Sequence, residues 1–156
     1  MKSKKIVLLR GGLDSTVVLA QVVDKFGADR VIALNMYYKQ HNDLEIECAK
    51  KVADYYNVEL IQLDLSTVFG NLKSAMLVLN PDAEDDFYVP ARNSIFLSIA
   101  SGIADSIEGV DEIYYGAHAD DAGGYPDTTI EYLRKMTDAM EEGTRQRVKI
   151  KAPFVY

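Results

Sequence analysis

Residues 6–16 have the sequence Ile6-Val7-Leu8-Leu9-Arg10-Gly11-Gly12-Leu13-Asp14-Ser15-Thr16. The four apolar residues at its start predict a strand, and the mostly apolar, glycine-free run 17–26 behind the glycine pair predicts a helix. A loop between them exposes backbone N–H groups at the positive end of the helix dipole, and glycine lets a phosphate approach without a Cβ in the way. The stretch therefore predicts a strand, a tight anion-binding loop and a helix.

This loop matches neither of two common phosphate-binding patterns. Gly11-Gly12-Leu13-Asp14-Ser15 fits neither the dinucleotide fingerprint G-x-G-x-x-G nor the pattern G-x-x-x-x-G-K-[ST]. The alternative to an anion site is an ordinary strand-to-helix turn in which Asp14 or Ser15 caps the helix. Both interpretations place a helix start here.

Length and composition indicate one globular domain, residues 1–156, with 48% hydrophobic and 26% charged residues. The net charge of −7, from 17 basic and 24 acidic residues, argues against a large duplex-binding face and favours small-molecule partners. The single cysteine, Cys48, excludes an intramolecular disulfide. The basic amino terminus precedes too short an apolar run for an export signal, and no apolar run approaches the roughly 18 residues of a membrane span. A cytoplasmic protein is the expectation.

The remaining sequence alternates between strand and helix patterns. Strands are expected at residues 6–9, 31–36, 58–65, 112–116 and 148–152, and helices at 14–26, 42–57, 92–107 and 128–142. This order predicts an α/β fold: a Rossmann-like parallel sheet of about five strands, the first strand central, with helices on both faces and ligands at the carboxyl ends of the strands. Residues 66–90 break the alternation of strand and helix patterns. They are either a lid over the site, with a short helix near 72–79, or a solvated connection.

Apolar spacing also predicts which helix faces turn inward. Thr128 and Glu131 have the spacing of a capping box at the start of the last helix. The residues expected to face the core are Leu44, Cys48, Val52 and Tyr55 in the second helix, Ile95, Ile99, Ile103 and Ile107 in the third, where Phe96 and Ala100 widen the stripe, and Ile130, Leu133, Met136 and Met140 in the last.

Three segments together carry a resemblance to a known family. Residues 10–15 resemble the S-G-G-x-D-S loop of the PP-loop ATP pyrophosphatases, the adenine nucleotide alpha-hydrolase type, with Arg10 in place of the first serine. With Val89-Pro90-Ala91-Arg92-Asn93 and the Gly124-Tyr125-Pro126-Asp127 segment that follows Gly116, the chain is similar from about Ile6 to Pro153 to the 7-cyano-7-deazaguanine synthases. The resemblance implies ATP-dependent, ligase-type conversion of 7-carboxy-7-deazaguanine, through an adenylated carboxylate and then an amide, to the nitrile preQ0 of queuosine biosynthesis, with ammonia as nitrogen source.

The resemblance also implies roles for individual residues. Catalytic roles fall to Asp14, Ser15, Arg92 and Asp120, and Asp14 or Asp120 would hold Mg²⁺. The substrate would contact Arg92, Asn93, Gly124, Tyr125, which can stack on the ring, and Asp127, which can accept hydrogen bonds from a guanine-like base. The ATP phosphate chain would lie on Arg10, Gly11, Gly12, Leu13, Asp14, Ser15 and Thr16.

Several of these assignments have open alternatives. Asp127 is equally well explained as the N-cap of the last helix, and Arg92 as one partner of a surface salt bridge. His41 and His118 are candidate general bases, although a lone loop histidine is more often merely exposed. Arg10, a long cation beside the loop, is expected to attract polyphosphate.

The departures from the family pattern leave two hypotheses for function. Family members continue into a segment with four zinc-binding cysteines, which Cys48 cannot replace, so no zinc is expected. The chain is either an enzyme acting on ATP, the deazaguanine acid and ammonia, or a non-catalytic nucleotide- or deazapurine-binding paralogue or truncated form. Direct nucleic-acid or membrane partners are not expected, and the ten tyrosines leave room for a homodimer.

Overall fold

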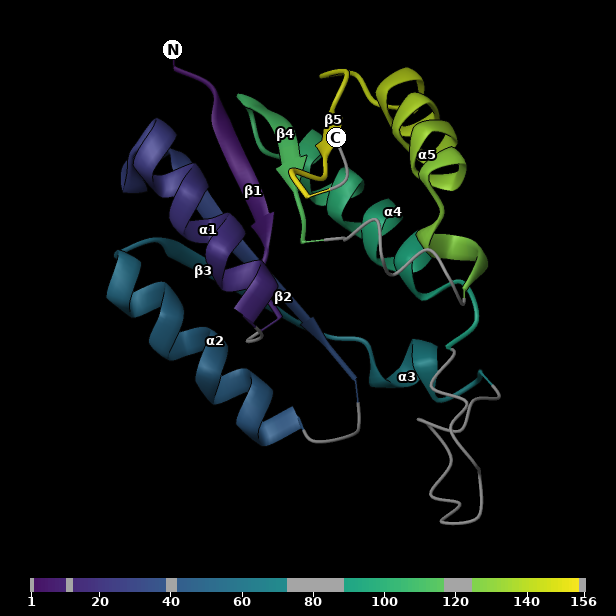
Figure 1. Ribbon diagram of the computed structural model, residues 1–156, viewed down its shortest axis with the longest axis horizontal. Helices are drawn as coiled ribbons and strands as arrows, with labels where there is room; N and C mark the ends of the chain where they lie inside the picture. The colour runs from purple at the N-terminus through teal and green to yellow at the C-terminus, as the bar shows by residue number, and fades with distance from the viewer. Residues whose placement is uncertain (1, 11–12, 39–41, 73–88, 117–124, 155–156) are drawn as a thin grey trace.

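The computed structural model describes residues 2–10, 13–38, 42–72, 89–116 and 125–154, which build a five-stranded sheet covered by helices (Figure 1). All strand pairs are parallel, in the order β3-β2-β1-β4-β5, so the predicted fold and the central position of the first strand are confirmed. The strands are β1 (Lys4–Leu8), β2 (Val31–Tyr37), β3 (Glu59–Asp64), β4 (Val110–Tyr114) and β5 (Lys149–Lys151). The helices are α1 (Leu13–Phe26), η1 (Ala28–Arg30), α2 (Asn42–Tyr56), α3 (Ser66–Phe69), α4 (Arg92–Ser106), η3 (Pro126–Thr128) and α5 (Ile130–Gly143).

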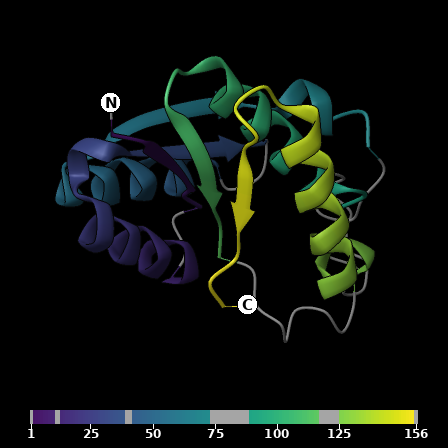
Figure 2. The same ribbon diagram turned by 90° about the horizontal axis from the view of Figure 1, so that it is seen from above.

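The two faces of the sheet bury separate apolar clusters because successive side chains of a strand point to opposite faces. In β1, Ile6 and Leu8 face the cluster under α4 and α5, whereas Val7, and Leu9 just beyond the strand, face the cluster under α1 and α2. Figures 1 and 2 show this arrangement, with one helix pair on each side of the sheet. Each fully buried aliphatic side chain contributes about 1.5–3 kcal/mol, so β1 stabilises both layers.

The predicted inward face of α2 is wrong by about one position. Leu44 and Tyr55 are 73% and 81% exposed, whereas Ala49 and Ala53 are buried. Alanines let the helix backbone approach the sheet closely. The helix is therefore rotated about its axis relative to the prediction, and Glu45 becomes half-buried. Cys48 is partly buried, and Val52 packs on the core as expected.

In α4, the isoleucines at four-residue spacing flank the buried face. That face consists of Phe96, Leu97, Ala100, Ser101 and Ala104, and the four isoleucines pack partly buried against it. Phe96 and Ala100, which were expected to widen the isoleucine stripe, thus belong to the buried face, and its small residues again allow close helix–sheet contact.

The start of the last helix also differs from the prediction. Thr129, and not Thr128, caps α5, since its Oγ1 accepts a hydrogen bond from Tyr132 N–H at 3.1 Å. Thr128 lies in η3 and donates its hydroxyl to the Tyr125 carbonyl at 2.8 Å. Leu133 is buried and Met136 and Met140 pack on the core, but Ile130 is 40% exposed.

The excursion after β3 begins with α3, whose Phe69 is fully buried. The short helix expected near residues 72–79 and most of the 66–90 excursion, whether lid or solvated connection, fall outside the described residues. Within the part of the chain that is described, no helix has the length and apolar character needed to cross a bilayer.

Candidate active site

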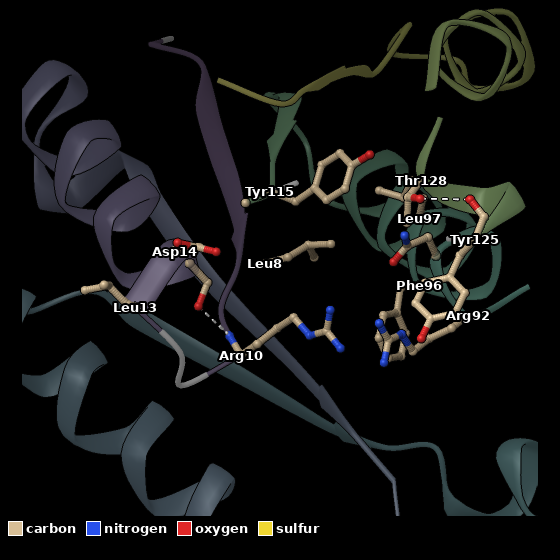
Figure 3. Close-up of a pocket in the computed structure, with 13 residues that line it drawn as sticks. Leu8, Arg10, Leu13, Asp14, Arg92, Phe96, Leu97, Tyr115, Tyr125 and Thr128 are labelled. Carbon is tan, nitrogen blue, oxygen red and sulfur yellow. Dashed lines mark hydrogen bonds between the residues drawn. The ribbon is translucent and has the colours of Figure 1, made fainter. Parts of the chain in front are cut away.

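A cavity of about 410 Å³ lies where β1 and β4 end, between the start of α1 and the start of α4 (Figure 3). Ligand sites of open parallel sheets occur at this edge. Its walls come from segments far apart in sequence, namely Leu8, Arg10, Leu13, Asp14, Ser15, Arg92, Asn93, Phe96, Leu97, Tyr115, Gly116, Tyr125 and Thr128.

The loop side of the cavity is fixed by a short hydrogen bond. The backbone N–H of Arg10 donates to Oγ of Ser15 at 3.0 Å, and Ser15 is only 5% exposed. This bond closes the turn from β1 into α1, so the first N–H groups of α1 stand at the cavity, where a helix favours anions.

Gly116, just after β4, lies against the same turn. A Cβ at Gly116 would lie 3.1 Å from the carbonyl carbon of Asp14 and 3.2 Å from the nitrogen of Ser15. Both neighbours are backbone atoms, so a side chain at this position would force the start of α1 to shift by a few tenths of an ångström, and the close approach favours glycine.

The side chain of Arg10 leaves the loop and crosses the cavity toward α4 (Figure 3). Its guanidinium lies 5.3 Å from the centroid of the Phe96 ring, a cation–π distance. The side chain keeps solvent access through the cavity, but surrounding protein atoms reduce the hydration of the guanidinium. This loss of hydration, followed by repulsion from Arg92, lowers the pKa of Arg10.

Arg92 faces Arg10 from the first turn of α4, and its Nη1 donates to the Tyr38 hydroxyl at 3.5 Å. The ring of Tyr38 is itself held by stacking on Phe69, with centroids 4.3 Å apart. Neither Arg10 nor Arg92 forms an ion pair with a carboxylate within the described ranges. The cavity wall therefore carries excess positive charge.

The negative charge of Glu45 interacts electrostatically with Arg10 and Arg92 without forming an ion pair. Burial raises the pKa of Glu45, while the positive charge of Arg10 and a hydrogen bond with Asn35 oppose that shift. Asn35 is fully buried, and its amide donates to the Leu9 carbonyl at 2.9 Å. A polar chain thus connects α2, through β2, to the end of β1.

Asp127 holds the start of α4 rather than that of α5. Its Oδ2 accepts a hydrogen bond from Asn93 N–H at 2.9 Å, and its backbone oxygen accepts one from the Asn93 side chain at 3.0 Å. Asp127 is 7% exposed. The helix-capping alternative therefore applies to a different helix from the one expected, and the bond fixes Arg92 at the cavity wall.

Most of the predicted site residues meet at this cavity. Arg10, Leu13, Asp14, Ser15, Arg92, Asn93 and Tyr125 line it, Asp127 lies behind Asn93, and Thr16 is not among the lining residues. Gly11, Gly12, His41, His118, Asp120 and Gly124 lie outside the described residues. The sequence analysis did not identify five residues as belonging to the site or its surroundings: Phe96, Leu97, Tyr115, Thr128 and Glu45. The first three have the apolar character of core residues, Thr128 has the spacing of a helix cap, and Glu45 lies on the polar face of its predicted helix.

The described residues contain no group of three or more His, Cys, Asp or Glu side chains arranged to hold a metal ion. Asp14 lines the cavity next to the helix start. One carboxylate suits Mg²⁺ bound mainly by phosphates and water, which is the usual arrangement when the ion accompanies a nucleotide.

Comparison with solved structures defines the class of fold. The U34-tRNA thiolase NcsA of Methanococcus maripaludis has a TM-score of 0.63 at 18% identity, covering 99% of this chain and 53% of the thiolase chain. The glutamine-dependent NAD⁺ synthetase of Acinetobacter baumannii has a TM-score of 0.58 at 17% identity, covering 88% of this chain and 29% of the synthetase chain. The parallel sheet with its loop at the start of α1 thus has the fold of the PP-loop ATP pyrophosphatases.

Sequence comparison identifies the family. Residues 4–156 match the family described as Queuosine biosynthesis protein QueC, and the chain belongs to this family. A 7-cyano-7-deazaguanine synthase of Picrophilus torridus is 39% identical over 171 residues, which cover 99% of this chain and 69% of that protein. The enzyme of the same name from Oceanobacillus iheyensis is 37% identical over 163 residues, covering 97% and 72% respectively.

Proposed function

We propose that the protein uses ATP and ammonia to convert 7-carboxy-7-deazaguanine to 7-cyano-7-deazaguanine. One observation carries the proposal: the end of β1, the start of α4 and the segment at Tyr125 meet around one cavity beside the anion-binding loop. These are the segments on which the family resemblance rests. Relatives named for this activity support the substrate assignment.

The reaction begins with activation of the acid. A carboxylate oxygen attacks the α-phosphorus of ATP and pyrophosphate leaves, which converts a poor acyl donor into an adenylate. Ammonia then attacks the acyl carbon, AMP leaves and a proton is lost, giving the amide. The amide oxygen then attacks the α-phosphorus of a second ATP and pyrophosphate leaves, after which loss of AMP, carrying that oxygen, and of two protons from the nitrogen gives the nitrile. Positioning and charge stabilisation are the main tasks of the protein in such steps.

The residues around the loop divide these tasks. We assign the ATP phosphates to the main chain from Arg10 to Thr16, including Gly11 and Gly12, with the Ser15 hydroxyl and the N–H groups at the start of α1 stabilising the leaving pyrophosphate. Asp14, together with Asp120, would hold Mg²⁺, which supplies positive charge to the phosphates when bound.

The opposite wall is assigned to the deazaguanine ring. Tyr125 lines the cavity and would stack on the ring, with Asn93 and Gly124 beside it. Asp127 would use Oδ1 for the base while Oδ2 keeps the Asn93 N–H. Arg92 contributes charge from the first turn of α4.

Product analysis tests the proposal. The full chain is incubated with ATP, Mg²⁺, ammonium and 7-carboxy-7-deazaguanine, and AMP, pyrophosphate and the nitrile are measured, with Ser15→Ala as the comparison. We expect AMP and pyrophosphate in equal amounts, nitrile by mass spectrometry, and a loss of at least about tenfold in Ser15→Ala, because one hydrogen bond to a charged group is worth about 1.5–3 kcal/mol. Binding of ATP and acid without pyrophosphate release would instead support a non-catalytic binding protein.

A further inference from the structure

Two guanidinium groups converge on one wall of the cavity. Arg10 reaches it from the end of β1 and Arg92 from the first turn of α4, and Figure 3 shows both groups directed toward the same region. Both residues line the same cavity, and repulsion from Arg92 contributes to the lowered pKa of Arg10. Within the described ranges neither guanidinium has an ion-pair partner, so an anion bound between them would relieve their mutual repulsion.

The guanidinium of Arg10 lies away from the phosphate loop. Its main-chain N–H is bound by Ser15, but its side chain extends to the ring of Phe96 on the opposite wall. The start of α1 and the guanidinium pair therefore form separate centres of positive potential within one cavity. Adenylation brings two anions together, and separate centres reduce the repulsion between them.

We propose that Arg10 and Arg92 jointly bind the carboxylate of a planar aromatic acid whose ring lies against Tyr125 at the cavity wall. This rests on the proposed function, in which such an acid is adenylated. A guanidinium matches a carboxylate by paired hydrogen bonds, and Tyr125, which lines the cavity, offers a flat surface to the ring. Because the PP-loop pattern has serine at position 10, Arg10 makes this carboxylate site a feature of this chain.

The proposal makes Arg10 a specificity-determining residue. The guanidinium pair stabilises a charged carboxylate but has no charge partner in the neutral amide that follows. Hydrogen bonds to charged groups are worth about 1.5–3 kcal/mol, which corresponds to roughly 10- to 150-fold in affinity. The acid is therefore preferred over its amide by a factor in this range.

Titration calorimetry on the full chain without ATP tests this assignment. The ligands are 7-carboxy-7-deazaguanine, its isosteric carboxamide, pyrophosphate and, as a simpler aromatic acid, indole-3-carboxylate. The proteins are the parent, Arg10→Gln, Arg92→Gln and a matched control, Arg134→Gln, at an exposed arginine of α5. In both cavity variants we expect affinity for the acids to fall about 10- to 100-fold, with less than about threefold change for carboxamide and for pyrophosphate in Arg10→Gln.

The outcomes separate this inference from the proposed function. An unchanged affinity of Arg10→Gln for both acids, or a loss confined to pyrophosphate, overturns the carboxylate site, as does a parent that binds neither acid. Arg10-dependent binding of the acids in a parent that releases no pyrophosphate from ATP supports the site and refutes the proposed reaction. If thermal melting shows that Arg10→Gln is unfolded, Arg92→Gln decides, since the proposal requires the same ligand pattern from either arginine.

Discussion

Lys5 and Arg10 lie near opposite ends of the same strand, yet different groups surround their charges. Lys5 is 4% exposed, and its Nζ lies 2.7 Å from Asp111 Oδ1 and 3.2 Å from Glu112 Oε2, with the ring of Phe26 4.8 Å away. Arg10 instead faces another arginine. A buried cation with its counterions stabilises the fold, whereas one that faces a like charge across a cavity is available to a ligand.

The amino end of β1 is where substitution should cost most stability. Lys5→Met keeps the length of the side chain but leaves Asp111 and Glu112 without their cation. We expect a loss of about 2–3 kcal/mol, less than for a fully buried pair because Asp111 is partly exposed, and therefore a fall in Tm of roughly 4–10 °C. Thermal unfolding followed by circular dichroism measures this change.

Lys149→Met is the matched control, since Lys149 is exposed on β5 and surface substitutions change stability by about 0.5 kcal/mol or less. Pyrophosphate affinity should be unaltered in both variants. A destabilisation of Lys5→Met no greater than that of Lys149→Met would show that the paired cation contributes nothing.

At the carboxyl end, Gly116→Ala disturbs the ligand site more than the fold. The new methyl group meets backbone atoms of Asp14 and Ser15 and pushes the start of α1 away from β4. We expect about tenfold weaker ATP binding by calorimetry, with a stability loss of about 1–2 kcal/mol.

The same substitution at Gly102 of α4, where a Cβ meets nothing within 4 Å, is the control and should raise stability by about 0.5–1 kcal/mol. Unchanged ATP binding in Gly116→Ala would mean that the contact between β4 and the loop has no part in nucleotide binding.

Removing the cation that faces Arg92 should cost almost no stability. Arg10→Met keeps apolar contact with Phe96 and abolishes the repulsion and the loss of hydration at the guanidinium. We expect a free energy of unfolding equal to that of the parent or higher by less than about 1 kcal/mol. A loss comparable to that of Lys5→Met, measured in urea, would contradict the difference between the two ends of β1.

The smallest effect is a pH dependence at Glu45. Because its pKa is raised in the folded protein, the folded state binds more protons than the unfolded state above the ordinary pKa of 4.5, and stability falls as pH rises through that window. Glu45→Gln removes this dependence. The Tm of the variant relative to the parent should rise from pH 5 to pH 8 by a degree or two, and a difference in Tm that falls over this range would show that Arg10 stabilises the Glu45 charge.

The sequence predicts the parallel sheet and its central strand better than it predicts helix faces. Residues 6–16 carry a strong local pattern, and the parallel sheet with a central β1 follows from the alternation of elements. The buried face of α2 differs from the predicted face because Ala49 and Ala53 pack closest to the sheet, while spacing rules give more weight to large apolar residues. In α4 the predicted stripe included Phe96 and Ala100, and the buried face is centred on these residues rather than on the isoleucines.

The pairing of charges could not be predicted from one sequence. Lys5 belongs to a basic amino-terminal run and has no sequence signal that distinguishes it, yet register places it beside Glu112. Arg10 was recognised as a departure from the loop pattern, but the direction of its side chain depends on Phe96, 86 positions later in the numbering. Such contacts arise from tertiary structure.

The all-parallel strand order also has a consequence for folding during synthesis. Three strands can pair as soon as β3 has left the ribosome at residue 64, but the other edge of β1 has no partner until β4 emerges at residues 110–114. Until then Ile6 and Leu8 lack the α4 layer that buries them, and β1 presents an unpaired edge. The same central strand that joins both layers is thus the segment that a nascent chain must protect longest from aggregation.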